Sequence, residues 1–260
     1  MKSRIAILLA TGFATVVLSC VVGCNRDESA ERAVKLYAGA GMRVGVDELI
    51  KAFSEQYGVE IDVEYGGSGP MMTRAKITKN GDLFMPGDVG WIDQLHADSG
   101  IVEDRSQVAY FVPVIIVEKG NPKGILRLED MLRKDLTIAL GNEFCQIGKA
   151  SAKIFAKNGL DLKVIDPQRL VRSKTVNELG SFVKNKRADA ALVWDAIAIN
   201  NANALDMIEI PLEQNRVSNV VVGMLSTGRN KKQARQFVDF ITSDAGQEIL
   251  KRNGYRTSKP

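Results

Sequence analysis

Four loops along the sequence share a design that suits the binding of an anion by uncharged groups. In each loop a predicted strand ends, a small or polar residue follows, and a predicted helix begins. Amide groups at the start of a helix lack an acceptor within it and lie at the positive end of its dipole, so they attract negative groups. Glycine lets the backbone approach a ligand without a Cβ in the way. The loops are Gly39-Ala40-Gly41, Gly66-Gly67-Ser68-Gly69, Cys145-Gln146-Ile147-Gly148 and Ser173-Lys174-Thr175.

Few side chains in or beside these loops could add to the backbone donors. The hydroxyl of Ser68 could donate to an oxyanion that bears no proton, although serine between glycines is also typical of a plain turn. Arg43, Lys149 and Lys174 could add positive charge or belong to solvated faces. We interpret Cys145 as a small residue in a tight loop, because a reactive thiol needs a lowered pKa.

The motifs of common enzyme classes are missing from the sequence. It contains one histidine, His96, and neither a G-x-S-x-G motif nor a glycine-rich nucleotide motif. The sequence therefore lacks motifs that hydrolases, zinc enzymes and P-loop proteins require. We expect a binding protein that is not an enzyme, with no cofactor and no protein-bound metal.

The elements that would position the loops alternate between strand and helix, which predicts an α/β fold. Apolar side chains at Val46, Leu49, Ile50 and Phe53 form one helical stripe, and Thr175 to Glu178 has the pattern of a capping box. Strands are expected at residues 33–38, 59–65, 82–85, 111–117, 137–140, 190–194 and 220–225. Helices are expected at residues 44–56, 91–97, 148–157, 175–184, 196–202, 231–242 and 244–253.

The order of these elements indicates a clamp of two lobes, each with mixed sheets flanked by helices. We expect residues 33–115 plus 223–260 in the first lobe and 116–222 in the second. Two chain crossings, near Phe111–Val117 and Asn219–Leu225, would make the hinge. Ligands of open α/β sheets lie beyond the carboxyl ends of the strands. Two of the four loops would therefore face the ligand from each lobe.

The N-terminus has the order of positive, apolar and small residues that export requires. Lys2 and Arg4 precede an apolar run over residues 5–22, which ends in Val21-Val22-Gly23-Cys24. This ending resembles the lipobox of bacterial lipoproteins, which implies cleavage after residue 23 and a lipid on Cys24. Residues 24–32 would be a tether. Cys20 is a second candidate for the lipid, and an uncleaved membrane anchor is the alternative to a signal peptide. The expected location is periplasmic or extracytoplasmic, on a membrane.

Charge and cysteine content narrow the partners further. Loss of residues 1–23 removes Lys2 and Arg4 and no acid, so the formal charge falls from +4 to +2. That bias does not indicate a nucleic-acid partner. With Cys20 removed and Cys24 acylated, Cys145 alone remains and cannot form an internal disulfide. The remaining chain can build an apolar core, and we expect a monomer.

Several blocks of the sequence resemble the periplasmic molybdate- and tungstate-binding protein family in their order and spacing. They are L-Y-A-G-A-G-M-R, Y-G-G-S-G, D-L-F-M-P-G-D-V-G-W-I-D, I-A-L-G-N-E-F-C-Q-I-G-K, A-D-A-A-L-V-W-D and the C-terminal F-V-D-F-I-T-S-D-A-G-Q-E-I-L-K-R-N-G-Y. The resemblance implies a two-lobed binding protein that hands an oxyanion to an ABC permease. It places ligand contacts at Gly41, Met42, Ser68, Gly69, Cys145, Gln146, Ile147, Val176, Trp194 and Asp195.

Two positions depart from the family pattern. Relatives often carry a serine where this chain has Gly41, and a tyrosine where it has Trp194-Asp195. A carboxylate facing a dianion would repel it. Either Asp195 points away as a helix cap, or the ligand offers it a proton. Sulfate, phosphate, a phosphorylated or carboxylic acid, or an iron complex therefore remain alternatives to molybdate and tungstate.

Overall fold

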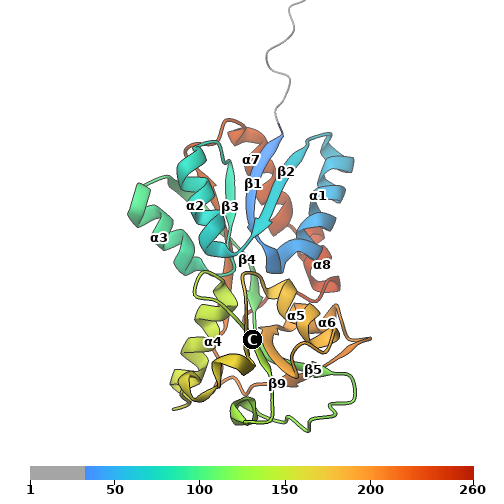
Figure 1. The fold of residues 1–260 in the computed structure, drawn as a ribbon. Helices are drawn as coiled ribbons and strands as arrows, with labels where there is room; N and C mark the ends of the chain where they lie inside the picture. Colours follow the sequence, from blue (N-terminus) through green and yellow to red (C-terminus); the bar gives the residue numbers. More distant parts are fainter. Residues whose placement is uncertain (1–32) are drawn as a thin grey trace, which may run out of the picture. The chain divides into compact units, whose positions relative to one another are not determined.

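Two five-stranded sheets organise the part of the protein that the structure, a computed structural model, describes, which is residues 33–260. The predicted leader, the lipidation site at Cys24 and the tether fall outside these residues. The predicted fold class, α/β with two mixed sheets flanked by helices, is confirmed (Figure 1). No helix within residues 33–260 is long and apolar enough to cross a membrane.

The first sheet and its helices are called lobe 1. Its strands lie in the order β2-β1-β3-β10-β4, with β1, β2 and β3 parallel and β10 antiparallel to both of its neighbours. The strands are β1 (Val34–Gly39), β2 (Ile61–Gly66), β3 (Leu83–Met85), β4 (Val102–Phe111) and β10 (Ser218–Leu225). The helices are α1 (Arg43–Tyr57), α2 (Ser68–Thr78), α3 (Val89–Ser99), α7 (Lys231–Thr242) and α8 (Asp244–Arg252), with a short 3-10 turn, η1 (Ala40–Met42), before α1.

The second sheet and its helices, called lobe 2, repeat this plan. The order is β7-β6-β8-β5-β9, with β6, β7 and β8 parallel and β5 antiparallel to its neighbours. The strands are β5 (Pro113–Glu118), β6 (Ile138–Gly141), β7 (Leu170–Ser173), β8 (Ala190–Trp194) and β9 (Leu205–Glu209). The helices are α4 (Gln146–Lys157), α5 (Val176–Lys184) and α6 (Asp195–Ile199), and the 3-10 turns are η2 (Leu128–Leu132), η3 (Leu162–Val164) and η4 (Pro167–Arg169).

The chain changes sheet at two places. Val112 separates β4 from β5, and residues 210–217 separate β9 from β10. Both changes come earlier than the boundaries expected after residues 115 and 222. The expectation treated 111–117 as one strand, but Val112 carries the chain from one sheet to the other, and β10 pairs with β4 from Ser218 onwards.

Local sequence explains where the helices begin and end. In α1 the side chains of Val46, Leu49 and Phe53 are fully buried, as the apolar stripe predicts, and Gly58 ends the helix in a left-handed conformation with φ 68°. The prediction of a capping box at the start of α5 is wrong, because its hydrogen bonds do not form. Thr175 occupies the cap position but its side chain makes no cap bond; the hydroxyl of Ser173 instead donates to the Glu178 carboxylate.

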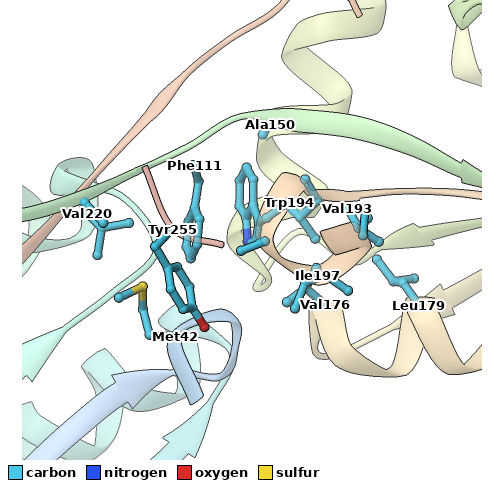
Figure 2. Close-up of a cluster of buried hydrophobic side chains, with 14 of the residues drawn as sticks. Met42, Phe111, Ala150, Val176, Leu179, Val193, Trp194, Ile197, Val220 and Tyr255 are labelled. Carbon is cyan, nitrogen blue, oxygen red and sulfur yellow. The ribbon is translucent and has the colours of Figure 1, made fainter. Parts of the chain in front are cut away.

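One large cluster of buried apolar side chains extends from lobe 1 into lobe 2. Figure 2 shows its central part, where Met42, Phe111 and Tyr255 from lobe 1 lie beside Trp194, Val176 and Ile197 from lobe 2. The rings of Phe111 and Trp194 stack with their centroids 4.7 Å apart and their planes 6° from parallel. The two lobes therefore share apolar packing next to the strand change at Val112.

Candidate functional site

A small cavity of about 20 Å³ lies where the two lobes meet. Its lining comes from both lobes, and no residue in that lining carries a charge. The lining residues are Gly39, Ala40, Gly41, Gly66, Gly67, Ser68, Gly87, Phe111, Cys145, Gln146, Ile147, Thr175, Val176 and Trp194. A cavity needs roughly 10–15 Å³ to hold one water. This cavity therefore suits a compact guest of only a few atoms.

The six parallel strands of the two sheets deliver this lining. β1, β2 and β3 end at Gly39, Gly66 and Met85, and the chain enters the cavity wall at or just after each end. In lobe 2, Cys145 and Thr175 follow the ends of β6 and β7, and Trp194 is the last residue of β8. The carboxyl ends of parallel strands meet at one sheet edge, which is where ligands of open α/β sheets bind. Two such edges face each other across the cavity.

The first residues of three helices and one 3-10 turn lie at the cavity, as the loop pattern predicts. α2 begins at Ser68, α4 at Gln146, α5 at Val176 and the 3-10 turn η1 at Ala40. All four positions line the cavity, so the amide-rich, positive ends of these elements converge on one small space. Neutral backbone groups thus supply the favourable potential for an anion.

Seven of the ten expected ligand residues lie in the cavity wall. They are Gly41, Ser68, Cys145, Gln146, Ile147, Val176 and Trp194. Met42, Gly69 and Asp195 do not line it. Met42 is fully buried in the apolar core, and the amide of Gly69 donates to the carbonyl oxygen of Phe144 at 3.1 Å.

Asp195 is turned toward the junction of the lobes. Its carboxylate accepts a hydrogen bond from Nε of Arg256 at 2.6 Å and from the amides of Val112 at 3.3 Å and Ala196 at 3.0 Å. The side chain is 1% exposed, so burial raises the pKa of the Asp195 carboxyl, and Arg256 and the two amides oppose that rise. The expected helix cap is wrong, because Trp194 occupies the cap position without a side-chain bond and Asp195 is the first residue of α6. The Asp195 carboxylate is held instead by Arg256, which lies far along the sequence.

Ser68 has the geometry of a donor into the cavity. Its side chain is buried, and Oγ accepts a hydrogen bond from the amide of Gly87 at 3.1 Å. No acceptor for the hydroxyl proton exists among residues 33–260. Because the amide occupies one lone pair, the hydroxyl can donate to a guest.

The two departures from the family pattern, at residues 41 and 194, form a single structural feature. A Cβ at Gly41 would lie 3.0 Å from Cδ1 and 3.2 Å from Nε1 of Trp194, and 3.2 Å from Cζ of Phe111. The stacked rings therefore occupy the space that a side chain at residue 41 would need. The indole N–H of Trp194 has no acceptor in the described part of the chain, so it is a further donor at the cavity.

The charged residues expected near the loops lie outside the cavity wall. Lys149 Nζ lies 3.4 Å from the ring centroid of Trp91, and the Arg43 guanidinium lies 4.1 Å from that of Tyr65. Burial, with a smaller contribution from Lys153, lowers the pKa of Lys149. Cys145 is buried in the wall, and burial raises its pKa to about 11, so its thiol stays protonated at neutral pH.

Two lining residues, Gly87 and Phe111, were predicted neither by the loop pattern nor by the family resemblance. Gly87 follows strand β3, and Asp88 then caps α3 by accepting from the amide of Gly90, so this loop has the same strand–glycine–helix order as the others. That signal was present in P-G-D. Phe111 ends the long strand β4, and nothing in its local sequence marks it as part of a site.

Comparison with known proteins agrees with this architecture. The family model described as bacterial extracellular solute-binding protein matches residues 34–256. The molybdate-binding protein ModA of Mycobacterium tuberculosis is 23% identical over 258 residues, which cover 95% of this chain and 97% of that protein.

Two solved structures share the fold. The periplasmic molybdate-binding protein of Azotobacter vinelandii superposes with a TM-score of 0.75 at 19% identity, covering 87% of this chain and 100% of that one. The sulfate-binding protein SubI of M. tuberculosis superposes with a TM-score of 0.77 at 18% identity, covering 88% of each chain. Together with the match over nearly all described residues, the cavity at the meeting of two α/β lobes leads to one conclusion: this chain belongs to the bacterial extracellular solute-binding protein family.

Proposed function

We propose that this protein captures a compact tetrahedral oxyanion, molybdate or tungstate, and delivers it to an ABC permease in the cytoplasmic membrane. The observation that carries the proposal is the small cavity between the two lobes, which is lined by helix starts and neutral donors. A dianion there would accept hydrogen bonds from backbone amides, the Ser68 hydroxyl and the Trp194 indole. Charge-assisted bonds of this kind are among the strongest in proteins.

The cavity also favours some of the alternative ligands over others. Phosphorylated or carboxylic organic acids carry a carbon skeleton, and the small space between the lobes favours the more compact inorganic oxyanions. A ferric ion prefers carboxylate, imidazole or phenolate ligands, and the cavity wall has none of these side chains. Phosphate near neutral pH carries a proton that needs an acceptor, while the Asp195 carboxylate is engaged with Arg256.

Sulfate is the second candidate. It is a fully ionised tetrahedral dianion, so neutral donors suit it as well as they suit molybdate, and the sulfate-binding protein SubI shares this fold. Molybdate and tungstate are larger than sulfate. The discrimination between them must therefore come from the size of the closed cavity.

Isothermal titration calorimetry with molybdate, tungstate, sulfate and phosphate tests the proposal. Binding of molybdate and tungstate with micromolar or lower Kd, and of sulfate at least tenfold more weakly, is the expected result. Tighter binding of sulfate would select the second candidate. No heat from any of the four anions, with the fold intact by circular dichroism, would refute the oxyanion proposal.

Ser68→Ala is the first variant to measure in the same assay. Loss of a buried donor to a charged acceptor should raise the Kd for molybdate by an amount equivalent to roughly 1–3 kcal/mol. Ser151→Ala is the matched control, since Ser151 is equally buried but donates to the Ile147 carbonyl within α4. An unchanged Kd in Ser68→Ala would assign Ser68 to the turn alone.

We further propose that Cys24 carries the lipid that holds the mature protein on the membrane, and that the protein works as a monomer. The support is the order of residues 1–24 and the extracellular character of the family. Mass spectrometry of the protein from a bacterial membrane fraction should find a chain that begins at residue 24 and carries acyl groups. A chain that retains residues 1–23 would contradict this.

A further inference from the structure

A set of contacts outside the cavity joins the two lobes at its rim. The indole Nε1 of Trp91, on α3 of lobe 1, donates to Oε1 of Gln146 at 2.7 Å. Nε2 of Gln146, at the start of α4 in lobe 2, donates to Oγ of Ser218 at 3.2 Å. Ser218 begins β10 and is fully buried. The Gln146 amide therefore bonds to two separate elements of lobe 1.

The side chain of Gln146 also packs closely against the backbone of lobe 1. A Cβ at Gly87 would lie 3.1 Å from Cβ and 3.3 Å from Cγ of Gln146. The bare backbone of Gly87 thus forms the floor of a slot in lobe 1, which the Gln146 side chain of lobe 2 fills. Only 7% of Gln146 is exposed.

Two further contacts cross between the lobes beside this slot. The ammonium group of Lys149, one helical turn after Gln146, lies over the ring of Trp91 at 3.4 Å from its centroid. The amide of Gly69 donates to the carbonyl oxygen of Phe144 at 3.1 Å. All of these bonds would break if the lobes moved apart, so their free energy contributes only to the closed form.

We propose that Trp91 and Gln146 form a latch that holds the closed clamp shut independently of the ligand. Trp91 is a positioning residue that acts through Gln146, whose backbone also starts a helix at the cavity. The inference rests on the proposed function, because it assigns to these residues control over how long a captured oxyanion is retained. An interaction made only after closure slows ligand release and leaves capture by the open form unchanged.

The first test is the kinetics of molybdate binding by the full chain carrying Trp91→Phe. The variant keeps an aromatic ring under Lys149 but loses the indole N–H. Because one hydrogen bond has a modest net free energy, the dissociation rate should rise by roughly 3- to 10-fold. The association rate should stay within about twofold. An unchanged dissociation rate, or an equal change in both rates, would overturn the latch.

Tyr37→Phe is the matched control for a general loss of stability. The Tyr37 hydroxyl bonds to Thr78 and Asn80, so all three partners lie within lobe 1. Removing that hydroxyl should lower the Tm without changing the dissociation rate of molybdate. Trp91→Phe should also lower the Tm, because it removes ring atoms from the core of lobe 1, but it alone should raise the dissociation rate of molybdate. If both variants change only the Tm, Trp91 has a structural role alone.

The second test measures closure without any ligand, so that it still decides the matter if molybdate does not bind. A Cβ built at Gly69 lies 3.4 Å from Cβ of Phe144, close to the roughly 3.5–4.5 Å found in disulfides. The pair Gly69→Cys and Phe144→Cys should therefore cross-link when the lobes close under mild oxidant. Adding Gln146→Met, which keeps the length of the side chain but loses both bonds, should slow the cross-linking several-fold.

The outcomes of the cross-linking separate the two proposals. Slower cross-linking with Gln146→Met supports the latch even if no oxyanion binds, in which case the proposed function alone fails. Equal rates with Gln146 and with Met at that position overturn the latch, whatever the protein binds. Gly69→Cys alone controls for pairing with Cys145, which should be negligible because that thiol is buried.

Discussion

At the scale of single residues, this cavity differs from the family pattern mainly in having an indole where relatives often have hydroxyl groups. The resemblance to molybdate-binding proteins led us to expect a serine and a tyrosine where this chain has Gly41 and Trp194. The structure links the two changes, because Trp194 fills the space beside residue 41 and stacks on Phe111. A side chain at residue 41 would therefore press against the Trp194 ring.

A double-mutant cycle should reveal this coupling. Gly41→Ser alone should weaken molybdate binding, because its Cβ would lie 3.0 Å from the Trp194 ring. Trp194→Tyr alone should also weaken it, because the indole N–H and part of the ring stack are lost. The double variant should bind better than the sum of the single effects predicts, with a coupling of about 1 kcal/mol or more by calorimetry. Additive effects would show that the two sites are independent.

The thiol of Cys145 gives a prediction about pH. Burial raises its pKa from 9.0 to about 11, so folding favours the protonated thiol. Stability from this group is complete below pH 9.0 and is lost as the pH rises through about 11. At pH 8 the thiolate fraction should be roughly 100-fold lower than in the unfolded chain. Iodoacetamide labelling of the Cys145 peptide, followed by mass spectrometry, should show at least that reduction in rate. Equal labelling of folded and unfolded protein would contradict it.

At the scale of secondary structure, the strands that sequence reasoning missed all lie at sheet edges, although the fourth edge strand, β2, was predicted from its alternating pattern. The buried strands β1, β5 and β8 were predicted from their apolar runs, β8 to the residue. β4, β7 and β9 were missed over most of their length. All three are edge strands that are only partly buried, so they lack the continuous apolar run that marks a central strand.

The loops of the site were predictable for a related reason. Strand ends followed by glycine or small polar residues mark the carboxyl edge of a parallel sheet, and this edge is where the cavity lies. The contacts of Asp195 and Gln146 were not predictable. Their partners, Arg256, Trp91 and Ser218, are distant in the chain, and only the completed tertiary structure brings them together.

The loop before α2 allows a sharp test of closure. Gly67 has φ −63° and ψ 146°, a conformation that alanine adopts freely. Its Cβ would nevertheless lie 2.8 Å from the backbone oxygen of Lys174 in the other lobe. Gly67→Ala should therefore fold normally but close incompletely, with molybdate binding weakened by about 1–3 kcal/mol, the usual cost of overpacking.

Gly180→Ala is the matched control for that variant. Gly180 lies within α5, and a Cβ there would meet only Cγ2 of Ile197 at an ordinary 3.4 Å. Its Kd should equal that of the wild type, and helix propensity should raise its Tm slightly. A wild-type Kd in Gly67→Ala would show that the loops separate more in the loaded form than in this structure.

At the scale of the whole molecule, a ligand held between two lobes should stabilise both of them together. Ligand at 100 times its Kd adds about 2.7 kcal/mol to the free energy of unfolding. For a protein of this size that corresponds to a rise in Tm of roughly 5–10 °C. Differential scanning calorimetry with molybdate should show one transition that shifts as a unit. A shift confined to part of the transition would mean that the anion binds to one lobe only.

Tyr255 and Arg256 tie the cavity wall to a part of the sequence far from the loops that form it. The Tyr255 hydroxyl donates to the carbonyl oxygen of Gly41 at 2.9 Å, and Arg256 holds Asp195 in the other lobe. Tyr255 thus fastens a cavity loop that lies far from it in the sequence. Deletion of residues 255–260 should therefore keep most of the fold but loosen the cavity wall at Gly41. For the same reason, purification tags at this end belong beyond a spacer after Pro260.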